Sequence, residues 1–184
     1  MFKSKGIIAL IALCFTACNT AENIGSLNTI HSDIQQAYPT ISHISAAELE
    51  SLLAADTPNL LILDTRPEAE YNVSHIKGAV QVNPDMTPQS FKARFGDIAA
   101  DKTVVIYCSV GWRSTAAAHR LTEAIIAAGG KTVSNLEGGL FGWHNDGRRV
   151  VNDFGPTPLI HPYNDKWGAL VSREQTLSYT PAQP

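Results

Sequence analysis

The sequence lacks several features that would assign it to a common functional class. Its 14 basic residues are outnumbered by 17 acidic ones, giving a net charge of −3, so it has no electrostatic footprint for nucleic acid. The six histidines show no metal-ligand spacing such as His-x3-His. The glycines at positions 138, 139 and 142 do not form the G-x-G-x-x-G dinucleotide fingerprint. We therefore predict no cofactor, no metal and no nucleic-acid partner.

Repeats and low-complexity tracts are also missing, while the composition suits a packed core. The chain has 184 residues, of which 44% are hydrophobic and 17% charged. These proportions are typical of a globular protein, and a domain usually spans about 100 to 200 residues. The sequence predicts a single domain with appendages, and we expect a monomer.

The N-terminus differs from the rest of the chain. Lys3 and Lys5 precede the apolar stretch Gly6 to Cys18, which is shorter than the roughly 20 residues of a membrane-spanning helix. This pattern predicts a secretion signal that is removed on export. Loss of the two lysines leaves 12 basic against 17 acidic residues, a net charge of about −5.

The end of this signal resembles a bacterial lipobox, in which small residues precede a cysteine that becomes lipidated. Phe15-Thr16-Ala17-Cys18 fits, although Phe15 replaces the usual leucine. We predict a signal peptide over 1–17, cleavage before Cys18, lipidation of Cys18, and a flexible tether over 18–43. The expected localisation is the periplasmic side, as a membrane-anchored lipoprotein. The alternative is ordinary cleavage with Cys18 incidental, which gives a soluble periplasmic protein.

Strands and helices alternate along the remaining chain. Ser45 and Glu48 form a capping box before the first helix, and LLIL (60–63) is a continuous apolar run of strand length. This alternation predicts an α/β fold with a mainly parallel sheet flanked by helices, and ligands bind beyond the carboxyl ends of such strands. The expected strands are 60–63, 79–82, 103–108 and 131–136, and the expected helices are 46–55, 88–95, 114–128 and 140–145.

Cys108 is the single cysteine left after processing, because Cys14 lies in the signal and Cys18 would be lipidated. An unpaired cysteine in an oxidising compartment is either a buried, inert thiol or a reactive one. Here it ends a predicted strand, Gly111 eases a turn, and Arg113 stands next to the start of a helix. Amides at a helix N-terminus and a nearby arginine favour a thiolate, so we interpret Cys108 as reactive.

Four segments in order resemble the rhodanese-like sulfurtransferase family. They are ISAAELESLL, LILDTRPEAEYNVSHIKGA, VVIYCSVGWRS and NLEGGLFGWHNDGRRVV, and they place a rhodanese-like domain at 44–151. The resemblance implies a catalytic cysteine, Cys108, that takes sulfane sulfur from a donor such as thiosulfate or a persulfide. It would hold the sulfur as a persulfide and pass it to cyanide or a thiol, including a thiol of a partner protein.

The resemblance also implies roles for the loop. Its six residues, 108 to 113, match the length used for sulfur transfer, whereas related phosphatases and arsenate reductases use seven. The amides of the loop would bind the persulfide, and Arg113 would aid an anionic donor. Val110 and Trp112 stand where some thiosulfate users have further basic residues, which leaves the donor open. The substrate-binding set is Ser109, Val110, Gly111, Trp112 and Arg113.

The remaining candidates are supporting residues. We expect Asp64 to accept hydrogen bonds near the loop, Arg66 to pair with Glu68 or Glu70, and His75 to cap or pack. The C-terminal extension over 152–184 is irregular, and we interpret it as a packed segment or as a docking segment for a partner. A membrane-tethered binding module with a rhodanese fold is the alternative from a different functional class.

Overall fold

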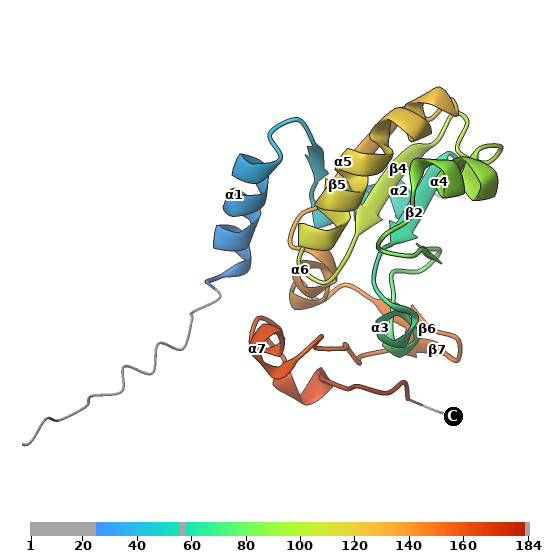
Figure 1. The fold of residues 1–184 in the computed structure, drawn as a ribbon. Helices are drawn as coiled ribbons and strands as arrows, with labels where there is room; N and C mark the ends of the chain where they lie inside the picture. Colours follow the sequence, from blue (N-terminus) through green and yellow to red (C-terminus); the bar gives the residue numbers. More distant parts are fainter. Residues whose placement is uncertain (1–24, 56–57, 183–184) are drawn as a thin grey trace, which may run out of the picture.

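The structure is a computed structural model that describes residues 25–55 and 58–182. Its centre is a five-stranded sheet in the order β1-β5-β4-β2-β3, with every neighbouring pair parallel (Figure 1). This confirms the predicted α/β fold with a mainly parallel sheet. The strands are β1 (Ser42–Ile44), β2 (Leu60–Asp64), β3 (Val80–Gln81), β4 (Thr103–Tyr107) and β5 (Thr132–Leu136).

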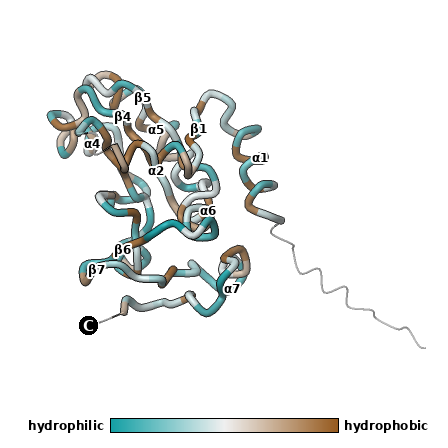
Figure 2. The backbone as a smooth tube through the Cα atoms, turned by 180° about the vertical axis from the view of Figure 1, so that it is seen from behind, coloured by the Kyte–Doolittle hydropathy of each residue, from teal (hydrophilic) through white to brown (hydrophobic). Residues whose placement is uncertain are grey.

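Helices cover both faces of the sheet. Along β4, Val104 and Ile106 join the cluster formed with α4 and α5, whereas Val105 and Tyr107 join the cluster formed with α2 and α6. Side chains alternate between the faces of a strand, so a strand buried on both faces is apolar throughout. In Figure 2 the backbone around β4 is coloured brown, which marks hydrophobic residues. The helices of the domain are α2 (Ala46–Ala54), α3 (Glu68–Val73), α4 (Pro88–Phe95), α5 (Trp112–Ala127) and α6 (Gly139–Asn145).

The start of α2 and the start of α5 bear on the sequence predictions. Ser45 and Glu48 form the predicted capping box, in which the Glu48 N–H donates to Ser45 Oγ and the Ser45 N–H donates to Glu48 Oε2. Helix α5 begins at Trp112, two residues before the predicted start. Trp112 and Arg113 therefore belong to the first turn of α5.

The prediction of a flexible tether over 18–43 is wrong for residues 27–37, which are helical. Residues Leu27–Ala37 form the helix α1, capped by Ser26, whose Oγ accepts the Thr29 N–H at 3.2 Å. Ile30 and Ile34 lie one turn apart on α1, and both are buried in the core. The burial of these two isoleucines in the core holds α1 on the domain. The predicted signal peptide, Cys18 and the first part of the tether lie outside the described residues.

The C-terminal extension packs against the domain. Strands β6 (Val150–Asn152) and β7 (Gly155–Thr157) form an antiparallel hairpin, and Val151 bridges to His75. The short helix α7 (Asp165–Gly168) and a 3-10 turn over Glu174–Thr176 follow. Figure 1 shows this tail, in orange and red, running beneath α3 and α6. Across residues 25–55 and 58–182, the structure contains no helix that is both long and apolar enough to cross a membrane.

Candidate active site

Cys108 directly follows the central strand β4 at its carboxyl end, and residues 109 to 111 join it to α5. Its side chain is 1% exposed, and the Gly111 N–H donates a hydrogen bond to Sγ at 3.2 Å. The first backbone N–H groups of a helix have no partner within the helix and carry a partial positive charge. The 16-residue helix α5 thus begins where a thiolate on Cys108 would be stabilised.

The turn of the Cys108 loop depends on Gly111. This residue caps α5 with φ 110°, a conformation that favours glycine. Its carbonyl accepts hydrogen bonds from Ser114 Oγ at 3.0 Å and Thr115 Oγ1 at 2.8 Å. A side chain at this position would also approach Ile34 of α1 to 3.1 Å. The loop is therefore packed from behind by α1, a contact that the sequence analysis did not predict.

The N-terminus of α6 fixes the other side of the loop. The Leu140 N–H donates to the Cys108 carbonyl at 2.8 Å, and the Phe141 N–H donates to the Ser109 carbonyl at 2.9 Å. Gly139 has φ 56°, and a Cβ there would stand 2.5 Å from the Cys108 carbonyl oxygen. Glycine at 139 is what allows α6 to approach the loop this closely.

Arg113 is held by Glu70 of α3. Its Nη1 donates to Glu70 Oε1 at 2.8 Å and its Nη2 to Oε2 at 3.0 Å, while Ser109 Oγ also donates to Oε2 at 3.0 Å. Burial opposes ionisation of Glu70, but its bonds with Arg113 lower the pKa of its carboxyl below the ordinary value. Burial likewise opposes the charge of Arg113, and the bond to Glu70 raises the pKa of its guanidinium. Sequence analysis missed this role of Glu70, because the contact spans 43 residues.

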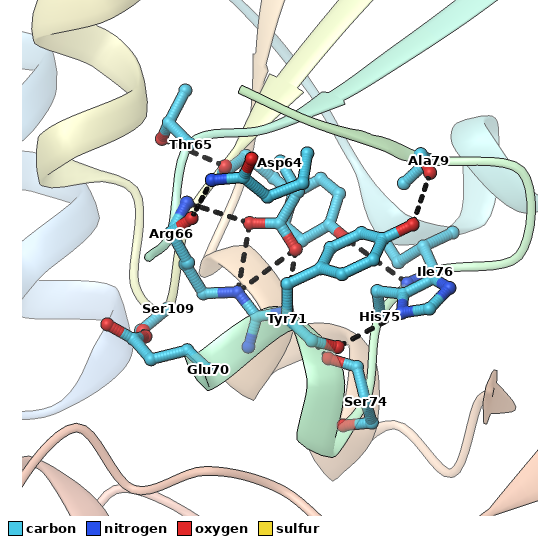
Figure 3. A network of polar contacts seen from close by, with 12 residues as sticks. Asp64, Thr65, Arg66, Glu70, Tyr71, Ser74, His75, Ile76, Ala79 and Ser109 are labelled. Atoms are coloured by element: carbon cyan, nitrogen blue, oxygen red, sulfur yellow. Dashed lines mark hydrogen bonds and ion pairs between the residues drawn. The ribbon is translucent and has the colours of Figure 1, made fainter. Parts of the chain in front are cut away.

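Asp64 and Arg66 form a buried ion pair, and both are 0% exposed (Figure 3). Arg66 Nη2 donates to Asp64 Oδ2 at 2.6 Å and to the Ser74 carbonyl at 2.7 Å. The prediction that Arg66 pairs with Glu68 or Glu70 is wrong. Arg66 pairs instead with Asp64, which is buried beside it at the end of the strand. Thr65 then binds the Tyr107 carbonyl through its N–H at 2.9 Å. The pair thus braces the residue that precedes Cys108.

His75 has a packing role, as predicted. Its ring stacks on Tyr71 with centroids 3.8 Å apart, and Nδ1 lies 3.1 Å from the Tyr71 carbonyl oxygen. The Tyr71 hydroxyl donates to the Ala79 carbonyl (Figure 3). These contacts fix α3, which carries Glu70.

A cavity of about 250 Å³ opens over Cys108. Four loop residues predicted to bind substrate line it, and two aromatic residues of the C-terminal extension complete it. Sequence analysis expected this extension to pack across the domain but did not place its residues in the site. A larger groove of about 360 Å³ lies between α4 and α5, away from the nucleophile. The cavity is lined by Cys108, Ser109, Val110, Trp112, Arg113, Tyr163 and Trp167.

Among the residues that the structure describes, no group of three or more histidine, cysteine, aspartate or glutamate side chains is arranged to hold a metal ion. The arrangement that remains is a buried thiol, an amide hydrogen bond, a helix N-terminus and an arginine. It can stabilise a sulfur anion and present it to a small cavity.

The comparisons with known proteins agree with this geometry. The family model described as a rhodanese-like domain matches residues 45–146. A sulfurtransferase of Allochromatium vinosum is 33% identical over 111 residues, which cover 60% of this chain and 95% of that protein. A tRNA uridine(34) hydroxylase of Streptococcus thermophilus is 31% identical over 65% of this chain, which spans about a third (35%) of the length of that enzyme.

Solved structures give the same fold at lower identity. The thiosulfate sulfurtransferase of Pseudomonas aeruginosa superposes with a TM-score of 0.52 and 22% identity, covering 68% of this chain and 23% of that one. A protein of Bacillus halodurans superposes with a TM-score of 0.51 and 18% identity, covering 70% of this chain and 87% of that one. At these identities the likeness extends to the fold alone.

Proposed function

The chain belongs to the rhodanese-like domain family, and from this membership we propose that it is a sulfurtransferase working through a Cys108 persulfide. The observation that carries the proposal is the position of Cys108 Sγ. This sulfur accepts a hydrogen bond from the Gly111 N–H at 3.2 Å. It lies near the N-terminus of α5 and borders the cavity. A thiolate or persulfide anion on Cys108 is stabilised there by the N-terminus of the helix and by Arg113.

The reaction has two displacement steps at sulfur. The Cys108 thiolate attacks the terminal sulfur of the donor, a new S–S bond forms, and the donor's own bond to that sulfur breaks. With thiosulfate the leaving group is sulfite, which keeps the electron pair. The acceptor, cyanide or a thiolate, then attacks the outer sulfur of the persulfide and leaves Cys108 as a thiolate. No oxidant, reductant or cofactor enters either step.

The acceptor comes from outside the chain in this proposal. Cys108 is the one cysteine among the described residues, and we propose that Cys14 and Cys18 are removed and lipidated respectively. A small thiol, cyanide or a thiol of a partner protein therefore completes the cycle. We propose that the protein acts as a monomer.

Thiocyanate formation tests this function. The purified protein, supplied with thiosulfate or inorganic polysulfide and then with cyanide, is expected to release thiocyanate catalytically. Cys108→Ser removes the nucleophile and should reduce the rate at least a thousandfold, whereas Ser51→Ala, on the exposed side of α2, should not. Thiocyanate release that is equally fast in Cys108→Ser would contradict the proposal. Tight capture of a protein partner without turnover of any donor would favour the binding-module alternative.

We also propose that the protein is exported and held on the periplasmic side of a membrane by a lipid on Cys18. Lys3, Lys5 and the apolar stretch from Gly6 support export, and Ala17-Cys18 supports lipidation. A labelled fatty acid fed to cells producing the full chain should enter the protein and be lost in Cys18→Ala. Processing with no label would favour the soluble periplasmic form instead.

A further inference from the structure

The cavity over Cys108 is built from two separate parts of the chain. The loop and the start of α5 supply its base, with Val110 and Trp112, and the C-terminal extension supplies Tyr163 and Trp167. Its volume of about 250 Å³ lies just below the roughly 300 to 1,000 Å³ of sites for drug-sized ligands. The cavity has the size for a small organic group next to the reacting sulfur.

The two aromatic residues of the extension are held in place over the loop. Asn164 caps α7 by accepting the Trp167 N–H at 3.0 Å. The end of the same segment is tied to α6, because Asn145 donates to the Leu170 carbonyl at 2.8 Å and accepts the Ser172 N–H at 2.8 Å. The wall of the cavity is thus part of the folded domain.

Tyr163 adopts a backbone conformation that is costly for its residue type. Its φ is 67°, in the left-handed region that side chains other than glycine rarely occupy. Its N–H donates to His161 Nδ1 at 3.0 Å, and its ring lies 5.0 Å from the Arg113 guanidinium carbon. Such conformations persist where the surrounding structure imposes them and are common at binding sites. Here the conformation places an aromatic ring at the mouth of the cavity.

The charge of the cavity does not suit a small dianion. Apart from the proposed Cys108 thiolate, Arg113 is the one charged side chain among the described residues that line it, and Glu70 pairs with it through two hydrogen bonds. The guanidinium also lies against the Tyr163 ring, an attractive cation–π contact. The faces of aromatic rings carry negative potential. Stabilisation of an anion is therefore confined to the part of the cavity near Sγ, where the loop amides and Arg113 lie. The outer part, formed by the two aromatic rings, favours an apolar or aromatic group.

We propose that Tyr163 and Trp167 select organic sulfur donors, in which the sulfane sulfur is attached to a group with an apolar or aromatic body, over inorganic thiosulfate. This inference rests on the proposed function of Cys108. With an organic thiosulfonate, R–SO₂–S⁻, the Cys108 thiolate attacks the terminal sulfur and the S–S bond to the sulfonyl group breaks. A sulfinate, R–SO₂⁻, leaves with the electron pair, and the R group lies against the two aromatic side chains.

Two donors that differ only in R test this selection. Benzenethiosulfonate and methanethiosulfonate carry the same charge and the same reacting bond, so the ratio of their kcat/KM values reports the contribution of the ring. The ratio is divided by the same ratio for the uncatalysed reaction of each donor with a free thiol, which removes the difference in intrinsic reactivity. We expect this normalised ratio to be about tenfold lower in Trp167→Ala and in Tyr163→Gly than in the wild-type protein. Glycine adopts the backbone conformation of residue 163 without strain, so this variant should fold.

Three controls make the result specific. Tyr163→Phe keeps the ring and should keep the wild-type ratio. Phe154→Ala removes another aromatic side chain of the extension, one that is 61% exposed and does not line the cavity, and it should keep the ratio as well. Thiosulfate, the third donor, should have a lower kcat/KM than benzenethiosulfonate with the wild-type protein.

The outcomes separate this inference from the proposed function. A persulfide on Cys108 together with a donor ratio that Trp167→Ala and Tyr163→Gly leave unchanged would overturn the inference and leave the sulfurtransferase standing. A lower ratio in both variants, with the wild-type ratio in both aromatic controls, would support it. Failure of Cys108 to accept sulfur from any of the three donors or from inorganic polysulfide would overturn both.

Discussion

Glu70 connects two residues of the Cys108 loop to α3. One carboxylate oxygen binds Arg113, and the other binds both Arg113 and Ser109 Oγ. Glu70 is 3% exposed, whereas the Arg113 side chain is 29% exposed. The carboxylate of this salt bridge is therefore buried, while its guanidinium is partly screened by solvent. Its main effect is to set the position and the charge of Arg113 at the cavity.

Glu70→Gln is expected to weaken this connection. The variant keeps the shape of the side chain but leaves the Arg113 charge without a counter-charge. The free energy of unfolding should fall by about 2 kcal/mol, below the roughly 3 to 5 kcal/mol of a fully buried pair, because Arg113 is partly exposed. Urea unfolding measures the loss, and Glu68→Gln, two residues away and exposed, is the matched control. Equal stability of the two variants would show that Glu70 does not brace the loop.

The release of Arg113 should also change the choice of donor. With Glu70→Gln, the guanidinium charge is no longer neutralised at the cavity. The kcat/KM for dianionic thiosulfate should rise about threefold or more relative to that for methanethiosulfonate. Steady-state rates with the two donors, at low and high salt, check this expectation. A relative preference for thiosulfate that stays the same or falls would contradict the account of the cavity charge.

At the scale of elements, the approach of α6 to the loop depends on Gly139. Gly139→Ala combines a strained φ with a Cβ only 2.5 Å from the Cys108 carbonyl oxygen. Gly147→Ala is the matched control, because φ is 80° there too but nothing lies within 4 Å. We expect the control to lose about 1 to 2 kcal/mol of stability and Gly139→Ala to lose more, with a large drop in sulfur transfer. Similar losses of stability in both variants would show that the close approach of α6 to the loop does not depend on glycine at position 139.

The packing of α1 gives a second prediction at this scale. Ile34 is fully buried beside the loop residue Gly111, so Ile34→Ala should cost about 2 to 5 kcal/mol of stability. Ile126→Ala, on α5 with 48% exposure, should cost less than about 1 kcal/mol. Urea unfolding of both variants measures the difference. A small effect of Ile34→Ala would mean that α1 is dispensable for the fold.

Four of the five strands of the sheet could be predicted from the sequence, whereas β1 (Ser42–Ile44) and the completion of the site could not. Continuous apolar runs and the Ser45 capping box mark strands and helices locally. In α1, two isoleucines one turn apart in a polar segment give too weak a period to predict a helix. The Glu70 contact with Arg113 and the position of Trp167 over Cys108 join distant residues. Such contacts are set by the packed fold and leave no local pattern.

At the scale of the whole molecule, one buried and two half-buried histidines couple folding to pH. Burial lowers the pKa of His43, His144 and His161, with the charge of His31 adding to the effect at His43 and that of Arg173 at His144. The folded state therefore binds protons on these rings less readily than the unfolded chain, in which histidine titrates near pH 6.5. The stability they contribute is present above about pH 6.5 and is lost as the pH falls through their lower folded values.

Urea unfolding between pH 7.5 and 5.0 tests this dependence. The free energy of unfolding should decrease steadily toward pH 5.0, a range above that in which the glutamates titrate. The slope should be smaller in His43→Gln than in the wild-type protein, and His119→Gln, at an exposed position, is the matched substitution. A stability that is constant or increasing toward pH 5.0 would mean that these histidines do not govern it.

The central claim for the whole molecule is that Cys108 carries sulfur, and the intact mass of the protein tests it most directly. After incubation with benzenethiosulfonate or inorganic polysulfide and removal of the donor, the mass should increase by about 32 Da, one sulfur atom. Cyanide should remove this mass, and Cys108→Ser should never gain it. A wild-type mass that stays unchanged with both donors, or an equal gain in Cys108→Ser, would contradict the account.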